Sequence, residues 1–245
     1  MEALTPNPSG QDDLSASGIN AQGGGVRTKC CWLLLLPLLG SALGCASNNP
    51  DVRVRRLPNG RLQVDGPLAG PFNTLEELAE KSCDIMTRQP GASNGPYGFE
   101  YCALYYHSRE ENAYFLSYLS DIRGSWDPVI KSCTLPNSLN DPTHSNTILL
   151  GGAHTHPNNR EFSARDLSAA AHWKPVRFFD TGTGKVWDRQ LMVFFREKTG
   201  ECRAYSYNNS THIVSALRKN TWVPIGEVYN ELGYIRLYEG KDWLP

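Results

Sequence analysis

Residues 146–168 read NTILLGGAHTHPNNREFSARDLS, and this stretch decides how the chain is interpreted. Its first part, NTILLGGAHTH, holds an apolar run that predicts a buried strand. The later part, continuing as SARDLSAAAHW over 163–173, predicts a helix. Side chains two positions apart on a strand point to the same side, so His154 and His156 should present two imidazoles to one face.

Two imidazoles on one face are a simple beginning for a metal site. Catalytic zinc usually has three protein ligands and keeps the fourth position for water. Asp166 is the downstream candidate for the third ligand, because the Pro-Asn-Asn turn at 157–159 could fold the chain back over the histidines. A hydrolase would also need a base, which should be a carboxylate that does not bind the metal strongly.

The same residues also have an ordinary interpretation. Ser163 and Asp166 have the spacing of a capping box, which would begin a helix without any metal. Histidine pairs also occur on strands as plain polar residues. Both interpretations stay open at the level of spacing alone.

The N-terminal part of the chain has the pattern of an exported lipoprotein. Residues 1–25 are polar and Gly-rich, which predicts a disordered leader or a start-site artefact with Val26 as the true start. Two basic residues then precede an apolar run at 32–43, which is too short to span a bilayer, since a span needs about 20 residues. The run ends in SALGC, which resembles a bacterial lipoprotein cleavage site.

We therefore expect a signal peptide over 26–44 and a lipid on Cys45. This interpretation places the protein in the bacterial cell envelope, on the periplasmic side of the outer or inner membrane. The alternative is a cytosolic protein with a buried apolar helix. After the signal we expect a tether and hairpin over 45–69 and one domain over 70–245.

Four cysteines follow the predicted signal: Cys83, Cys102, Cys133 and Cys202. An even number in an exported protein permits two disulfides, and three pairings are possible. None has the paired spacing of a zinc knuckle.

The remaining pattern predicts an α+β fold, in which a mixed, mostly antiparallel sheet is flanked by helices. We expect a helix at 73–88, where Thr74 and Glu77 have capping-box spacing. The other expected elements are a hairpin at 52–66, paired strands at 97–108 and 112–121, a long loop at 122–145, a hairpin at 189–208, a short helix at 213–219, and strands at 221–229 and 232–238.

Charge and size exclude several classes of protein. The chain has 245 residues, of which 40% are apolar, enough for one sizeable core. Lys and Arg (24) nearly balance Asp and Glu (25), and no block of like charge stands out. A nucleic-acid partner is therefore not expected.

The segment HTHPNNREFSARD resembles the signature of the JAB/MPN (JAMM) metalloprotease superfamily. That signature is His-x-His, commonly followed by Pro, then a loop and Ser-x-x-Asp, with a Glu on an earlier strand. The stretch GFEYCALYY has the form of the Glu strand, which points to Glu100. The resemblance covers roughly residues 70–205. It is closest to a bacterial branch often attached to Rhs-type repeat and polymorphic-toxin proteins.

The resemblance implies a role for each matching residue. His154, His156 and Asp166 would bind Zn²⁺. Glu100 would activate water as a base and then protonate the leaving nitrogen, while Ser163 would help to stabilise the oxyanion. It also implies a JAB/MPN-like fold with cytidine-deaminase-like layering.

The chain departs from the family pattern in two places. Six residues, 157–162, separate the second histidine from the serine, where the family usually has seven. Bulky residues also follow Glu100, where many members have glycines that let a substrate approach.

The function expected from these patterns is a zinc-dependent peptidase or isopeptidase-type hydrolase. Its substrate would be a peptide or protein, and a lipid on Cys45 would hold it to a membrane. One alternative is a catalytically inactive envelope lipoprotein that keeps the fold and binds a partner. A second alternative is a toxin or effector module.

Overall fold

The computed structural model describes residues 49–123, 131–167, 177–179, 184 and 186–244. Contacts group Cys45–Pro245 into one compact unit. The predicted leader, signal segment and lipidated cysteine lie outside the described residues, as does the end of the predicted helix at 163–173. Within the described ranges, no helix has the length and apolar character needed to cross a membrane.

Strands dominate the described part of the chain. In chain order its elements are β1 (Val54–Arg56), β2 (Leu62–Asp65), β3 (Ala69–Phe72), α1 (Leu75–Thr87), the short 3₁₀ helix η1 (Gly95–Tyr97), β4 (Cys102–Ser108), β5 (Ala113–Leu116), β6 (Ser138–Asn140), β7 (Thr147–Thr155), α2 (Ala164–Leu167), β8 (Arg177–Phe179), β9 (Val186–Asp188), β10 (Gln190–Arg196), β11 (Cys202–Asn208), β12 (Ile213–Arg218), β13 (Thr221–Val228) and β14 (Ile235–Leu237).

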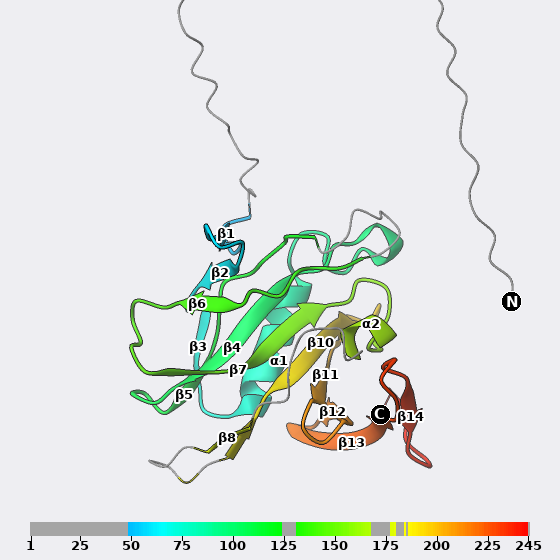
Figure 1. The fold of residues 1–245 in the computed structure, drawn as a ribbon. Helices are drawn as coiled ribbons and strands as arrows, with labels where there is room; N and C mark the ends of the chain where they lie inside the picture. The colour runs from blue at the N-terminus through cyan, green and yellow to red at the C-terminus, as the bar shows by residue number, and fades with distance from the viewer. Residues whose placement is uncertain (1–48, 124–130, 168–176, 180–183, 185, 245) are drawn as a thin grey trace, which may run out of the picture. The chain divides into compact units, whose positions relative to one another are not determined.

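The main sheet has the order β14-β13-β12-β11-β10-β7-β4-β5-β3 among the described strands (Figure 1). Strands β7 and β10 are parallel, and the other neighbours in this sheet are antiparallel. The predicted hairpin at 52–66 is confirmed as β1–β2, which joins β6 in a smaller sheet. The predicted fold is therefore confirmed only coarsely: the sheets are mixed and mostly antiparallel, but helices are few and the protein is mostly β.

The predicted helix at 73–88 is confirmed as α1. Its start is fixed locally, because the Thr74 hydroxyl accepts a hydrogen bond from the Glu77 amide at 3.1 Å. The Glu77 carboxylate accepts one in turn from the Asn73 amide at 2.9 Å. Buried residues such as Leu78 and Met86 face the sheet, and α1 packs along one side of it, across β10 and β11 (Figure 1).

The predicted short helix at 213–219 is wrong, because these residues form β12. The strand pairs with β11 on one side and β13 on the other, and Val214 and Ala216 are buried in alternation with less buried neighbours. Lys219 and Asn220 both have positive φ, at 49° and 58°, which builds a tight two-residue turn into β13. This strand adds to the sheet and lowers the helical content relative to the prediction.

The long loop expected at 122–145 is also partly wrong, because it contains β6. That strand adds in parallel to β2, so the loop returns to the N-terminal hairpin. The strands expected at 97–108 and 112–121 are confirmed as β4 and β5, but both are shorter than expected, and β4 begins only at Cys102, so that Glu100 precedes the strand. The hairpin at 189–208 is confirmed as β10 and β11.

The two faces of the main sheet carry separate cores. Along β10, Met192 belongs to the core beneath α1, whereas Val193 belongs to the core of the opposite face. His154 is the partner of Val193 across the β7–β10 pair, so its side chain lies on the face away from α1. Leu167 of α2 is part of the core on that same face. The sheet thus directs the histidine toward α2.

Two disulfides join elements that are distant in sequence. One links Cys83 of α1 to Cys202 of β11, and the other links Cys102 of β4 to Cys133. The structure therefore selects one of the three pairings that the sequence left open.

Candidate metal centre

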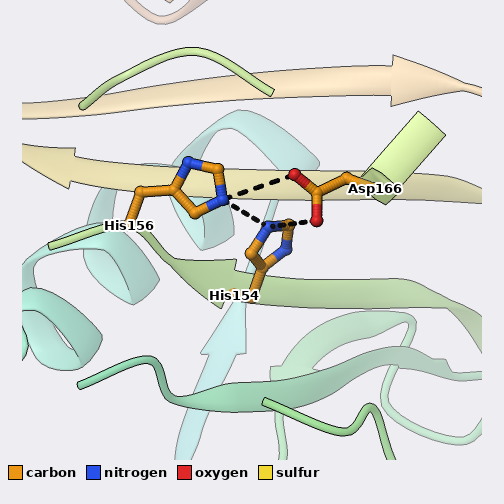
Figure 2. Close-up of side chains that lie close together, drawn as sticks. All are labelled: His154, His156 and Asp166. Atoms are coloured by element: carbon orange, nitrogen blue, oxygen red, sulfur yellow. Dashed lines mark hydrogen bonds and ion pairs between the residues drawn. The ribbon is translucent and has the colours of Figure 1, made fainter. Parts of the chain in front are cut away.

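The two histidines lie at the end of β7, where the strand passes into the 157–162 loop. Both are buried, with 4% of His154 and 7% of His156 exposed. Their Nε2 atoms lie 3.0 Å apart and face each other (Figure 2). The sequence expectation that both imidazoles share one side of the strand agrees with this geometry.

Asp166 lies on α2 and points at both histidines (Figure 2). Its Oδ1 lies 3.4 Å from Nε2 of His154, and its Oδ2 lies 3.4 Å from Nε2 of His156. These three residues come from two segments that the turn after His156 folds together. They could hold a metal ion.

The spacing of the three donors fits a small divalent cation. Ligands at about 2.05 Å from a tetrahedral zinc ion lie about 3.3 Å from one another. Here the two Nε2 atoms lie 3.0 Å apart, and each has a different carboxylate oxygen of Asp166 at 3.4 Å. One ligand atom from each of the three residues lies within 4.8 Å of the other two. Two imidazole nitrogens and one carboxylate are also a usual ligand set for catalytic zinc.

Asn159 fixes which nitrogen of His156 faces the centre. Nδ1 of His156 lies 3.2 Å from Oδ1 of Asn159. A carbonyl oxygen only accepts, so Nδ1 donates its proton to it, and Nε2 would present its lone pair to a metal ion that takes the place of the proton on Nε2. Such second partners orient metal-bound histidines in many proteins. The sequence reasoning missed Asn159, although its position in the turn three residues after the histidine was a usable signal.

Asp166 is held as an anion. Burial alone would raise the pKa of this carboxyl group, but the charge of His154 and hydrogen bonds from both imidazoles hold it well below its usual range. The amide and hydroxyl of Ser163 also donate to Oδ2, at 2.8 and 2.7 Å. A carboxylate with these donors stays ionised, as a metal ligand must.

Ser163 therefore acts first as a helix cap. Its Oγ accepts from the Asp166 backbone amide at 3.2 Å, and its own backbone amide donates to the Asp166 carboxylate, which completes the predicted capping box. The cap and the metal interpretation are compatible, because the cap orients the carboxylate toward the histidines. The oxyanion role stays a prediction, and it would require the hydroxyl to turn away from Asp166.

The short loop after His156 is pinned by a salt bridge. Both Nε and Nη2 of Arg160 lie 2.9 Å from the two carboxylate oxygens of Glu197, at the start of the β10–β11 turn. Both side chains are partly buried, so this bidentate pair is worth more than a fully exposed one. The six-residue loop thus delivers Asp166 despite lacking one residue relative to the family pattern.

Glu100 lies just before β4, beside the end of β7. The next residue, Tyr101, exchanges hydrogen bonds with Thr155, which separates the two histidines in sequence. Burial raises the pKa of Glu100 to about 7. The charge of His156 lowers this pKa, whereas the negative charge of Asp166 raises it further. The electrostatic coupling to two of the three metal-ligand candidates indicates that Glu100 borders the site without being one of its donors.

No family model matches the chain, and no curated protein or solved structure matches it.

Proposed function

We propose that the protein is a zinc-dependent peptidase or isopeptidase of the JAB/MPN type. The observation that carries this proposal is the convergence of His154, His156 and Asp166 at a buried strand end, where their ligand atoms lie within 4.8 Å of one another. Glu100 beside them, with a pKa of about 7, has the acidity of an effective general base near neutral pH. No other cluster of at least three such donors occurs among the described residues.

His154, His156 and Asp166 would hold the ion. Bound zinc would supply Lewis-acid polarisation of the scissile carbonyl and would lower the pKa of water. Glu100 would take a proton from the attacking water and pass it to the leaving nitrogen. Ser163 would orient Asp166 and, when its hydroxyl turns, donate to the oxyanion.

Exposed aromatic side chains next to the site support a polypeptide substrate. Tyr97 and Phe99 are 84% and 43% exposed, and they lie directly before Glu100. Their segment packs on the loop after His156. Gly98 lies so close to Pro157 that a Cβ atom at Gly98 would collide with the proline. Such surfaces suit a chain with apolar side chains better than a small polar molecule.

A second exposed group lies beside α2. Tyr229, Leu232 and Tyr234 surround the β13–β14 turn and are between 52% and 64% exposed. The turn lies near α2 (Figure 1). The two are in contact, since a Cβ at Gly233 would lie 2.5 Å from the Ala164 carbonyl oxygen. The segments that carry Glu100 and Asp166 are therefore each bordered by exposed aromatic residues.

We also propose that the protein is exported and held to the bacterial envelope through Cys45. The SALGC pattern supports this location, and the two disulfides support an oxidising compartment. A second candidate function is an inactive binding lipoprotein on the same fold. The engagement of the Ser163 hydroxyl by Asp166 favours that candidate.

The test is hydrolysis of a quenched-fluorescent peptide library by the zinc-loaded protein. We expect cleavage by the parent and by Glu80→Ala, which removes an exposed carboxylate of α1. We expect no cleavage by Glu100→Ala with zinc still bound, nor by the parent stripped with a chelator. A zinc-loaded parent that cleaves no peptide would reject the peptidase and leave the binding lipoprotein.

A further inference from the structure

The carboxylate of Glu100 is tied to a segment that is distant in sequence. Its Oε2 accepts a hydrogen bond from the backbone amide of Cys133 at 3.2 Å. A base must be held in place to take a proton from a defined position, and a misplacement of about 1 Å can cost about 10²-fold in rate. The anchoring of Cys133 therefore bears directly on Glu100.

The Cys102–Cys133 disulfide supplies a covalent anchor for this amide. The Cα atoms of the two cysteines lie 5.7 Å apart. Cys102 opens β4, two residues after Glu100, and it is the register partner of His154. The disulfide thus fastens the amide donor to the same strand end that carries the carboxylate, directly beside a candidate metal ligand.

The segment around Cys133 also has noncovalent contacts among the described residues. The amide of Thr134 donates to the Ile122 carbonyl at 2.7 Å, and the Ser120 hydroxyl donates to the Thr134 carbonyl at 3.3 Å. Cys133 also forms a single β-bridge with Arg123. In the described part of the chain this bridge is the only sheet pairing of Cys133, so its position depends on the covalent link as well as on these contacts.

We propose that the Cys102–Cys133 disulfide positions Glu100 and makes the reaction sensitive to reduction. The inference rests on the proposed function. Reduction by a phosphine breaks the S–S bond with two electrons: each sulfur gains a proton from water, and the phosphine takes the water oxygen to become its oxide. The two thiols release Cys133, the hydrogen bond to the carboxylate is lost, and Glu100 no longer has a fixed orientation. His154, His156 and Asp166 keep their own contacts, so metal binding persists.

The second disulfide is a matched control within the same chain. Cys83 and Cys202 join α1 to β11, and Cys83 belongs to the core beneath α1, on the face away from His154. Its removal lowers stability without touching the donor to Glu100.

The test compares Cys102→Ser/Cys133→Ser with Cys83→Ser/Cys202→Ser, under conditions where both are folded. We expect both double variants to bind one zinc ion per chain. For Cys102→Ser/Cys133→Ser alone, the kcat for hydrolysis of a peptide that the parent cleaves should fall about 10²-fold, with KM nearly unchanged. Phosphine treatment of the parent should reproduce that loss, and Cys83→Ser/Cys202→Ser should remain equally sensitive to phosphine.

A second readout needs neither zinc nor activity. In the metal-free protein, the amide proton resonance of Cys133 should move when Glu100 is replaced by Ala, because the hydrogen-bond acceptor is removed. After reduction the same replacement should leave that resonance unmoved. An equal response in both redox states would overturn the inference, as would an equal loss of kcat in both double variants. A parent without any hydrolysis would reject the peptidase, while the resonance test would still decide the positioning role.

Discussion

Replacing Glu100 by Gln should stabilise the metal-free protein at alkaline pH and leave it nearly unchanged at acidic pH. Burial raises the pKa of Glu100 to about 7 from its ordinary 4.5. A carboxyl group whose pKa is raised by folding stabilises the folded state, and this contribution is fully present below pH 4.5. That contribution is lost as the pH rises through about 7, because the ionised form is then buried.

The magnitude follows from the size of this change. A pKa difference of one corresponds to about 1.4 kcal/mol. The difference between the ordinary pKa of 4.5 and about 7 therefore limits the change in the free energy of unfolding to roughly 3 kcal/mol. Glu100 is only half-buried and its carboxylate has a backbone donor, so we expect about 1–2 kcal/mol. Gln keeps the shape and an accepting oxygen but cannot ionise.

The assay is urea unfolding in the presence of a chelator at pH 4.5 and pH 8.5. Glu100→Gln should raise the free energy of unfolding relative to the parent by about 1–2 kcal/mol more at pH 8.5 than at pH 4.5. Glu80→Gln, on the exposed side of α1, should change it by less than about 0.5 kcal/mol at both. The same difference at both pH values for Glu100→Gln would refute the argument from burial.

Three further predictions follow from individual contacts. In a pH–rate profile, the rate of peptide hydrolysis should fall about tenfold per pH unit below the pKa of Glu100, since only the ionised carboxylate accepts a proton. A bound cation should move that pKa below 7. Gly151→Ala should destabilise the protein by at least about 3 kcal/mol in thermal unfolding, because its Cβ would collide with the Gln190 carbonyl and the Tyr105 ring. Removing the Cys83–Cys202 bridge, which spans 119 residues, should cost about 2–5 kcal/mol in urea unfolding.

Features fixed by local interactions could be predicted from the sequence. The start of α1 depends on Thr74 and Glu77, which are neighbours in the chain, and the β10–β11 hairpin depends on its own turn. The strand β12 was mistaken for a helix because its short apolar pattern suits both structures, and the sheet neighbours on both sides decide between them.

Features that depend on long-range packing could not be predicted. The disulfide pairing, the Arg160–Glu197 bridge and the amide of Cys133 join segments more than thirty residues apart. The surroundings of His144 depend on long-range packing as well. This histidine lies 2.6 Å from Asp141 and 3.0 Å from Glu111, but only the fold brings that second carboxylate to it.

The candidate metal residues fall between these cases. Two histidines on one strand face follow from the period of a strand, and the capping box after them is local. The contact between the histidines and Asp166 depends on the 157–162 loop. The length of that loop alone does not show whether it brings Asp166 to the histidines. Glu100 could be selected among the carboxylates only through the family resemblance, and the structure gives it a separate physical basis in its coupling to His156.

Metal binding by His154, His156 and Asp166 can be measured by calorimetric titration of the chelator-stripped protein, prepared without a His tag, with zinc. We predict one site per chain in the parent and in His212→Ala, a histidine outside the site, and none in His154→Ala/His156→Ala. A folded parent that binds no zinc would contradict this prediction and would leave the segment as a strand, a turn and a capped helix.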